Sequence, residues 1–320
     1  MKTYYLLRIA SALSRFLPAR VGYWLASLVG GLVFYIAPSI RRAIMDNLRH
    51  VLPEASFHER RGLARKVIRN QLKNYYDLVR LPHMKPDDVR RMIASIEGLE
   101  HLEAALKENK GVLVTGGHIG NFSVVAQLAA VLGYKTAIIA EDIKPDKLYE
   151  YVNSLREHFG LEMIKVGSAQ VRTIFKFLRN GGLLMVAGDR DVSDNGLPVK
   201  FFDATADLPS GPVVLSLRMK VPLLPCFTCR LPNNKNVLTI YPPMEWEVTG
   251  DHDRDVEVNM RKMARVLEDL IRKTPDQWVV LQRIWDKDYT GMEGSDSTPA
   301  SEGTPPHVED KEPVPALAER

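Results

Sequence analysis

Cysteine is scarce in this sequence, with two residues among 320. Two thiols cannot form a disulfide framework, which excludes the small disulfide-stapled proteins of oxidising compartments. Disordered and collagen-like chains are excluded as well, because 45% of the residues are hydrophobic and 26% are charged. The sequence contains no internal repeat. A chain of this length and composition can bury one large core or two modest ones.

Acidic side chains are nearly absent from the first fifty residues, which carry seven Lys or Arg and a single Asp. The basic residues flank the most apolar stretch of the chain, residues 21–40, and do not line a polar face. This pairing favours an anionic membrane surface as the partner and argues against nucleic acid. We therefore expect residues 1–50 to form a membrane-associating helical segment.

Residues 21–40 carry no formal charge, and about 20 mainly apolar residues suffice to cross a bilayer core. Gly30, Gly31 and Pro38 weaken this run as an ideal span. The pattern predicts membrane association by one helix or a shallow helical hairpin; the alternative is a buried core helix of a soluble domain. Aromatic residues near both ends of the run are typical of interfacial anchors; they are Tyr23, Trp24, Phe34 and Tyr35.

The spacing of apolar residues changes along the rest of the chain. Residues 41–110 space their apolar side chains by three and four, which predicts helices. From residue 111 onward, short apolar runs alternate with helical stretches, which predicts an α/β fold with a mixed, mostly parallel sheet flanked by helices. The predicted strands are residues 111–115, 135–140, 183–187 and 221–227, and the predicted helices are residues 122–132, 146–159, 169–179 and 254–273.

The last thirty residues differ in composition from everything before them. Gly, Ser, Thr, Pro and Glu dominate residues 291–320, which hold seven acidic and two basic side chains and no apolar period. Such a segment is predicted to be a disordered acidic tail. The chain thus divides into the N-terminal segment 1–50, an α/β domain at residues 51–290, and the tail.

Ionisable residues follow three of the predicted strands: His118, Glu141 and Asp189. Ligands of parallel sheets bind at the carboxyl ends of the strands, where these side chains are expected to meet. His118 follows Gly116 and Gly117, and such a turn suits backbone N–H groups that stabilise an anion or a developing oxyanion. A His at this position can take the proton from a hydroxyl as general base; the alternative is a His that hydrogen-bonds locally or caps the helix.

The segment His118-Ile-Gly-Asn-Phe122 resembles the first motif of the lysophospholipid acyltransferase superfamily, in which four residues separate a His from an Asp or Glu. The resemblance spans residues 5–285 and is to the branch of lipid A late acyltransferases and phosphatidylinositol mannoside acyltransferases. Further blocks match in order and spacing: Arg42 with Asn47-Leu48 and Pro53; Glu141 with Arg156 and Gly160-Leu-Glu162; Arg179-Asn-Gly-Gly182; Asp189-Arg-Asp191 with Gly196; Phe201-Phe202 with Pro209-Ser-Gly-Pro212; Val221-Pro-Leu-Leu-Pro225; and Pro275 with Gln277-Trp278.

This resemblance implies a membrane-associated O-acyltransferase with His118 as general base. Such an enzyme moves an acyl chain from acyl-CoA or acyl carrier protein (acyl-ACP) to a hydroxyl of a glycolipid or lysophospholipid. It implies no metal and no cofactor beyond the acyl thioester cosubstrate, and we expect it at the cytoplasmic face of the plasma membrane. Gly120, Asn121 and Ser123 are expected to contact the substrate beside the base.

One position departs from the family pattern, because Ser123 stands where the family has a carboxylate. A serine can accept a hydrogen bond from an imidazole but supplies no negative charge to it. Either another acid orients His118, or the chain is a catalytically impaired lipid-binding relative. The candidate acids are Glu141, Asp189 and, more weakly, Asp203. Glu141 and Asp189 could instead form ordinary ion pairs with Arg156 or Arg190.

Four more residues are substrate-binding candidates. Arg190, beside Asp191, is expected to bind a phosphate of the donor or of the lipid headgroup, since a guanidinium suits oxyanions; the alternative is a structural ion-pair network. Phe201 and Phe202 are candidates for the floor of an acyl groove, or for plain core.

Two other patterns are weaker. Cys226 and Cys229 have redox or zinc spacing, but strand residues three apart point to opposite faces, and a second ligand pair is missing from the sequence. A serine hydrolase with Ser123 as nucleophile would need the Gly-x-Ser-x-Gly elbow, which this segment lacks.

Overall fold

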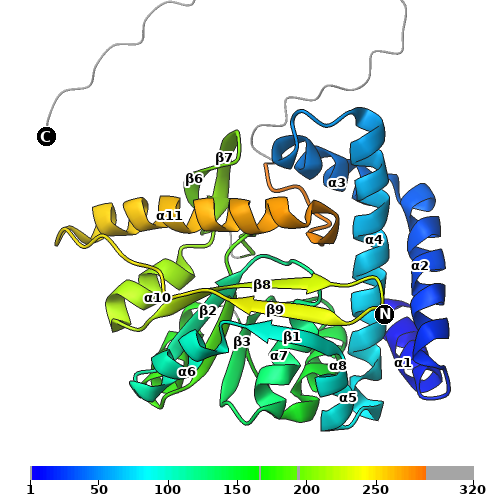
Figure 1. Cartoon of the computed structure of the whole chain (residues 1–320), viewed down its shortest axis with the longest axis horizontal. Helices are drawn as coiled ribbons and strands as arrows, with labels where there is room; N and C mark the ends of the chain where they lie inside the picture. The colour runs from blue at the N-terminus through cyan, green and yellow to red at the C-terminus, as the bar shows by residue number, and fades with distance from the viewer. Residues whose placement is uncertain (1, 166, 193–194, 286–320) are drawn as a thin grey trace, which may run out of the picture. The chain divides into compact units, whose positions relative to one another are not determined.

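A seven-stranded sheet with the strand order β1-β9-β8-β2-β5-β3-β4 lies at the centre of the protein (Figure 1). The computed structural model describes residues 2–165, 167–192 and 195–285. Strands β8, β2, β5, β3 and β4 run parallel, β9 is antiparallel to β8, and β1 pairs with β9 in parallel, which confirms the predicted mixed, mostly parallel sheet. The strands are β1 (Ile93–Glu97), β2 (Val112–Gly116), β3 (Thr136–Ala140), β4 (Glu162–Lys165), β5 (Leu183–Ala187), β8 (Leu223–Arg230) and β9 (Asn236–Ile240), with β6 (Leu197–Phe201) and β7 (Ala204–Leu208) in a separate antiparallel hairpin.

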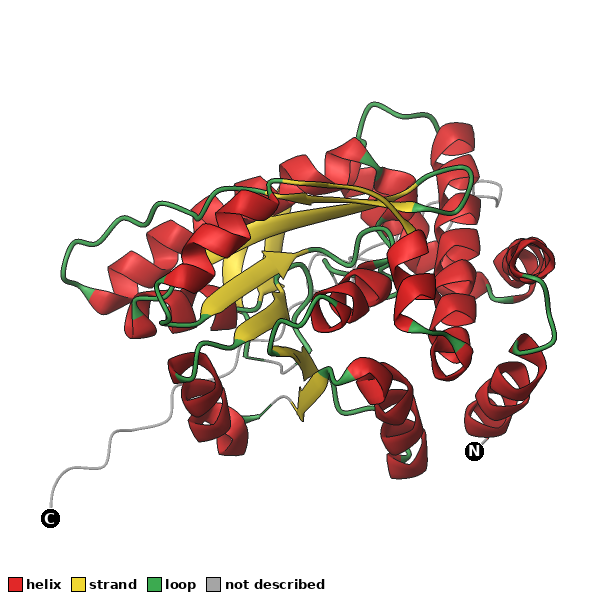
Figure 2. Ribbon diagram, turned by 60° about the horizontal axis from the view of Figure 1, so that its bottom comes forward, coloured by secondary structure: helices red, strands yellow, loops and turns green. Residues whose placement is uncertain are grey.

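Helices cover both faces of the sheet, as predicted (Figure 2). Val112 and Val114 of β2 pack into the hydrophobic cluster of one face, whereas Leu113 packs into the cluster of the other. Burial on both faces explains why this strand reads as a continuous apolar run. The α-helices are α1 (Lys2–Ser14), α2 (Ala19–Ile36), α3 (Pro38–Val51), α4 (Phe57–Arg80), α5 (Pro86–Arg91), α6 (Leu99–Lys107), α7 (Phe122–Val131), α8 (Asp146–Arg156), α9 (Val171–Arg179), α10 (Gly211–Met219) and α11 (His252–Lys273).

Several strands lie where the sequence pattern does not reveal them. The stretch at residues 41–110, expected to be helical throughout, contains β1. This short strand is mostly exposed and pairs with β9, with Ile96 opposite Leu238, so a partner far along the chain overrides the local pattern. Strand β4 and the β6–β7 hairpin also mix polar with apolar residues, which hides them from a search for apolar runs.

The sheet order brings the carboxyl ends of β2 and β5 side by side. The two strands are in register from Val112 opposite Leu183 to Gly116 opposite Ala187. Strand β3 pairs with the other edge of β5. The residues that follow these three strands therefore gather at one edge of the sheet, as expected for a ligand site in a parallel sheet.

The apolar stretch at residues 21–40 forms most of α2 and the start of α3, and α2 packs against α4. A Cβ atom on Gly22 would lie 1.9 Å from the ring of Tyr76, and one on Gly30 would lie 2.8 Å from the Cα of Arg69. These two glycines therefore let α2 approach α4 closely.

Most of the remaining surface of α1 and α2 is apolar and exposed. Figure 1 shows α4 between the sheet and these two helices. Among the described helices, α2 is the one long and apolar enough to cross a membrane, and 28% of its span is buried. We call the exposed large apolar side chains of the two helices the N-terminal apolar face: Tyr5, Leu6, Ile9, Leu13, Val21, Trp24, Leu25, Leu28, Val29, Leu32, Tyr35 and Ile36.

The expected boundary near residue 50 coincides with the end of α3 at Val51. Helices α2 and α3 both contact α4, which belongs to the residues that follow this boundary. The tail expected at residues 291–320 lies outside the described residues.

Candidate functional site

His118 lies in the turn between β2 and α7. Gly120 in this turn has a φ of +58°, and a Cβ there would lie 2.5 Å from the carbonyl oxygen of Thr228, so the position requires glycine. Asn121 caps α7, because its side-chain oxygen accepts a hydrogen bond from the backbone N–H of Val124 at 3.3 Å. The turn therefore fixes His118 between a strand end and a capped helix.

Asp189 is bound to His118 by two hydrogen bonds. The Nδ1 atom of His118 lies 2.8 Å from Oδ1 of Asp189, and the backbone N–H of His118 donates to Oδ2 at 2.7 Å. Asp189 follows β5, the neighbour of β2, and its side chain is fully buried. The structure thus places one of the expected acids against the imidazole.

Trp278 is a third member of this arrangement that strand-end reasoning misses. Its indole N–H donates to Oδ2 of Asp189 at 2.8 Å, and the backbone N–H of Val279 donates to the carbonyl of His118 at 2.8 Å. Trp278 lies far from both partners in the sequence and follows no strand of the sheet. The one signal in the sequence is its place in the Gln277-Trp278 block.

The environment of Asp189 keeps this carboxyl ionised. Burial by itself raises the pKa of Asp189, but the charge of His118 and the hydrogen bonds from His118 and Trp278 outweigh burial and hold the pKa below its ordinary value. An ionised carboxylate only accepts hydrogen bonds, so Nδ1 of His118 carries the hydrogen. Nε2 of a neutral His118 then has a free lone pair and can act as a base.

The backbone amides expected to stabilise an oxyanion are largely occupied. The N–H of His118 donates to Asp189, the N–H of Ile119 to the carbonyl of Gly117 at 2.7 Å, and the N–H of Gly120 to the carbonyl of Gln277 at 2.9 Å. The expectation that the amides of this whole turn serve an oxyanion is therefore wrong for these three, because they hold the turn in place.

Glu141 is separated from the His118 pair by its own partner. Its carboxylate forms an ion pair with Arg190, and Arg190 also donates to the side-chain oxygen of Gln282. For Glu141, the structure therefore favours the alternative of an ordinary ion pair with an arginine, here Arg190. Asp191 accepts a hydrogen bond from the backbone N–H of Gly196 at 2.6 Å.

The remaining candidates lie away from His118. Phe201 and Phe202 pack with Trp285 in a buried cluster beneath α11, so the expectation that they floor an acyl groove is wrong. Asp203, the weakest candidate acid, lies 2.6 Å from the Nδ1 atom of His50.

The two cysteines form no metal site. Burial raises the pKa of the Cys226 thiol to about 12, which keeps it protonated at neutral pH. Within the described part of the chain, no group of three or more His, Cys, Asp or Glu side chains is arranged to hold a metal ion.

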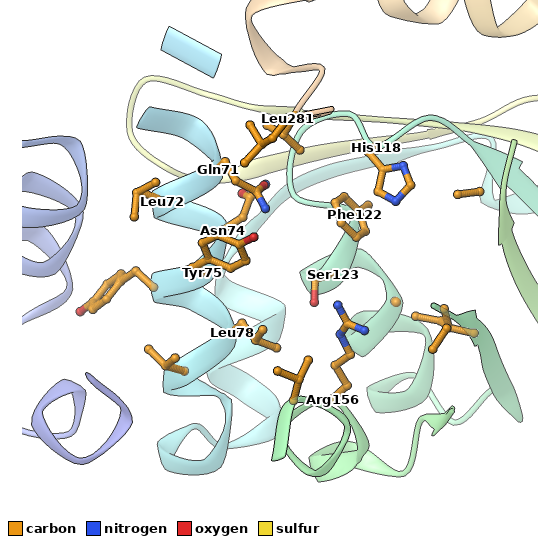
Figure 3. A pocket seen from close by; sticks show the side chains of 18 of the residues that line it. Gln71, Leu72, Asn74, Tyr75, Leu78, His118, Phe122, Ser123, Arg156 and Leu281 are labelled. Carbon is orange, nitrogen blue, oxygen red and sulfur yellow. The ribbon is translucent and has the colours of Figure 1, made fainter. Parts of the chain in front are cut away.

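A largely apolar cavity of about 980 Å³ opens beside His118. This volume is at the upper end of the range for ligand pockets. The cavity lies between the N-terminal helices, α4, α7 and α8, and Figure 3 shows His118 and Ser123 facing it. Glu141 and Arg190 also line it, so the polar groups of the site share one space with the side chains that supply the apolar wall: Leu7, Ala26, Leu78, Val125, Leu148 and Val152.

A buried polar network connects α2 to the turn that carries His118, and the sequence alone does not reveal it. Asp77 of α4 accepts hydrogen bonds from the hydroxyl of Tyr23 at 2.6 Å, from the side-chain amide of Asn121 at 2.8 Å, and from Arg230 at 2.7 Å. Asn74 adds a bond to the carbonyl of Gly120 at 2.7 Å. Gly120 and Asn121, expected to contact substrate, are thus held by the protein itself.

The family described as bacterial lipid A biosynthesis acyltransferase matches residues 1–287. A phosphatidylinositol mannoside acyltransferase of Mycobacterium tuberculosis is 26% identical over 213 residues, which cover 65% of this chain and 66% of that protein, slightly less than two thirds of its length. A protein of the same name from Mycolicibacterium smegmatis is 24% identical over 232 residues, covering 71% of this chain and 74% of the relative.

Proposed function

The chain belongs to a family of acyltransferases, the bacterial lipid A biosynthesis acyltransferases, and on this premise we propose that it is a membrane-associated O-acyltransferase. It transfers an acyl chain from acyl-CoA or acyl-ACP to a hydroxyl of a glycolipid or lysophospholipid. The observation that carries the proposal is that His118, paired with the buried Asp189, lies on the wall of a large apolar cavity.

The pair supports general base catalysis of acyl transfer. Nε2 of His118 takes the proton of the acceptor hydroxyl, and the hydroxyl oxygen attacks the thioester carbonyl carbon. The carbon–sulfur bond then breaks, and the departing thiolate takes the proton from the His118 imidazolium to become a thiol. Asp189 holds the Nδ1–H and stabilises the imidazolium that forms between the two proton transfers.

Asp189 also supports an active enzyme over an impaired lipid-binding relative. Ser123 supplies no negative charge to the imidazole. Asp189 supplies this charge from the end of the neighbouring strand β5. Its Oδ1 atom lies 2.8 Å from Nδ1 of His118, and its side chain is fully buried. The absence of a family carboxylate at Ser123 is therefore compatible with catalysis.

The N-terminal apolar face supports attachment to a membrane surface. One side of α2 packs on α4 through Gly22 and Gly30, while the other side exposes Trp24 and Leu28 at 62% and 56% of their surface. A helix that is buried on one side and apolar on the other fits a position in the plane of the interface. Helices α1 and α2 also line the cavity, so an acyl chain in the bilayer lies next to the site.

The proposal is tested by incubating the purified full-length protein with radiolabelled acyl-CoA or acyl-ACP and a panel of glycolipids and lysophospholipids in vesicles. We expect label in one class of acceptor lipid. Absence of transfer to every acceptor, from a folded protein that still binds acyl thioesters, would favour the lipid-binding relative.

A further inference from the structure

Arg156, at the end of α8, places an unpaired positive charge in the apolar cavity. Its backbone carbonyl accepts a hydrogen bond from the side chain of Gln127 at 2.7 Å. Among the residues that the structure describes, its guanidinium has no hydrogen-bond or ion-pair partner. Arg156 nevertheless lines the cavity, where Figure 3 shows the guanidinium directed toward Ser123.

Two hydroxyl groups face the same space. The Ser123 hydroxyl points toward Arg156, and the Tyr75 hydroxyl points from α4 into the cavity (Figure 3). Neither hydroxyl has a hydrogen-bond partner within the described ranges of the chain. The acid in this part of the cavity, Glu141, is already paired with Arg190. The protein therefore offers three donor groups around one volume, and none of the three has a hydrogen-bond or ion-pair partner among the described residues.

The charge of Arg156 is poorly compensated by its surroundings. Burial lowers the pKa of Arg156, and Tyr75, Tyr149 and Glu141 act in the opposite direction with smaller effect. The Arg156 side chain is half-buried, and a guanidinium that has lost part of its water is unfavourable unless it is paired and hydrogen-bonded. An anionic ligand would satisfy this group, and the apolar walls on either side of it favour a ligand with a hydrocarbon chain.

We propose that Arg156, with the hydroxyls of Ser123 and Tyr75, binds the carboxylate of a free fatty acid whose chain lies in the apolar cavity. A carboxylate has two oxygens, which suit the paired N–H groups of a guanidinium and two further O–H donors. The inference rests on the proposed function in assigning the cavity to acyl chains. It adds a second ligand class, which competes with the acyl donor for that cavity.

The test is isothermal titration of the full-length protein with dodecanoate and with 1-dodecanol, which has the same chain without the charge. We expect the wild type to bind dodecanoate at least ten-fold more tightly than dodecanol. Arg156→Gln should reduce this preference to less than three-fold and leave dodecanol binding unchanged, while Arg156→Lys should retain part of it. Arg172→Gln, an exposed arginine on α9, is the matched control and should behave as wild type.

A second variant keeps the test independent of the stability of the Arg156 variants. Ser123→Asp places a carboxylate opposite the guanidinium, so it should also abolish the preference for dodecanoate over dodecanol. Equal binding of the two ligands by wild type would overturn the proposed carboxylate site, and so would a preference that persists in both Arg156→Gln and Ser123→Asp. Neither result would contradict the assignment of the cavity to acyl chains. If neither ligand binds, the assignment of the cavity to acyl chains fails, whereas the proposed catalysis is judged separately by acyl transfer.

Discussion

Asp189 accepts hydrogen bonds from both the imidazole Nδ1 and the backbone N–H of His118, at 2.8 and 2.7 Å. The first bond sets which ring nitrogen can act as a base, and the second ties the end of β2 to the end of β5. One buried carboxylate therefore orients the side chain and the backbone of the same residue.

Asp189→Asn should lower acyl transfer by about 10²- to 10⁴-fold, because an amide cannot stabilise the imidazolium that forms during proton transfer. The measurement is kcat/KM with saturating acceptor lipid. Glu141→Gln is the matched control, and we expect a smaller loss, since Glu141 contacts Arg190 and not His118. Asp189→Asn activity within ten-fold of wild type would show that His118 works without a charged partner.

The lowered pKa of Asp189 predicts a specific loss of stability in acid. Its carboxyl ionises more readily in the folded protein than in the unfolded chain, whose Asp pKa is about 3.9. This contribution is therefore complete well above pH 4 and is lost as the pH falls through the folded pKa. Thermal melts at pH 6 and pH 3 should show a smaller decrease in Tm for Asp189→Asn than for wild type. An equal decrease would mean that Asp189 is not stabilised as an anion by the fold.

Asp77→Asn should destabilise the protein by about 3–5 kcal/mol, because it leaves the buried Arg230 without its charged partner. Urea unfolding measures this change. Asp87→Asn removes an exposed ion pair with Arg90 and should lower the free energy of unfolding by less than about 1 kcal/mol. If both variants lose a similar free energy of unfolding, the buried network around Asp77 does not stabilise the fold more than an exposed ion pair does.

The N-terminal apolar face predicts how the protein binds membranes. Changing both Trp24 and Leu28 to Glu should reduce co-sedimentation with anionic vesicles at least ten-fold, because both side chains are exposed and apolar. Val248→Glu is the control, since Val248 is 74% exposed but lies outside α1 and α2. If the double variant sediments like the Val248 variant, another surface attaches the protein to the membrane.

The sequence predicts the sheet class and three strand-end residues because short β-branched runs and the residues after them are local features. It cannot decide between Glu141 and Asp189, because that choice depends on β5 being the neighbour of β2. Trp278 reaches Asp189 across 89 residues of sequence, and no local pattern contains this contact.

Other parts of the prediction fail for the same physical reason. Phe201 and Phe202 have the composition of an acyl-groove floor, but their position under α11 depends on long-range packing with Trp285. Strand β1 is too exposed to show a continuous apolar run, and its pairing with β9 defines it. The close packing of α2 on α4 through Gly22 and Gly30 likewise depends on a second helix and cannot be seen in the sequence of α2 alone.

The most direct test of the account is the rate of acyl transfer by His118→Ala, compared with wild type, in the vesicle assay with labelled acyl thioester. Loss of the general base should reduce transfer by at least 10²-fold. The circular dichroism spectrum should be unchanged, while the Tm should fall, because the buried Asp189 carboxylate loses the imidazole that hydrogen-bonds it. Activity of the folded variant within ten-fold of wild type would contradict the assignment of His118 as the catalytic base.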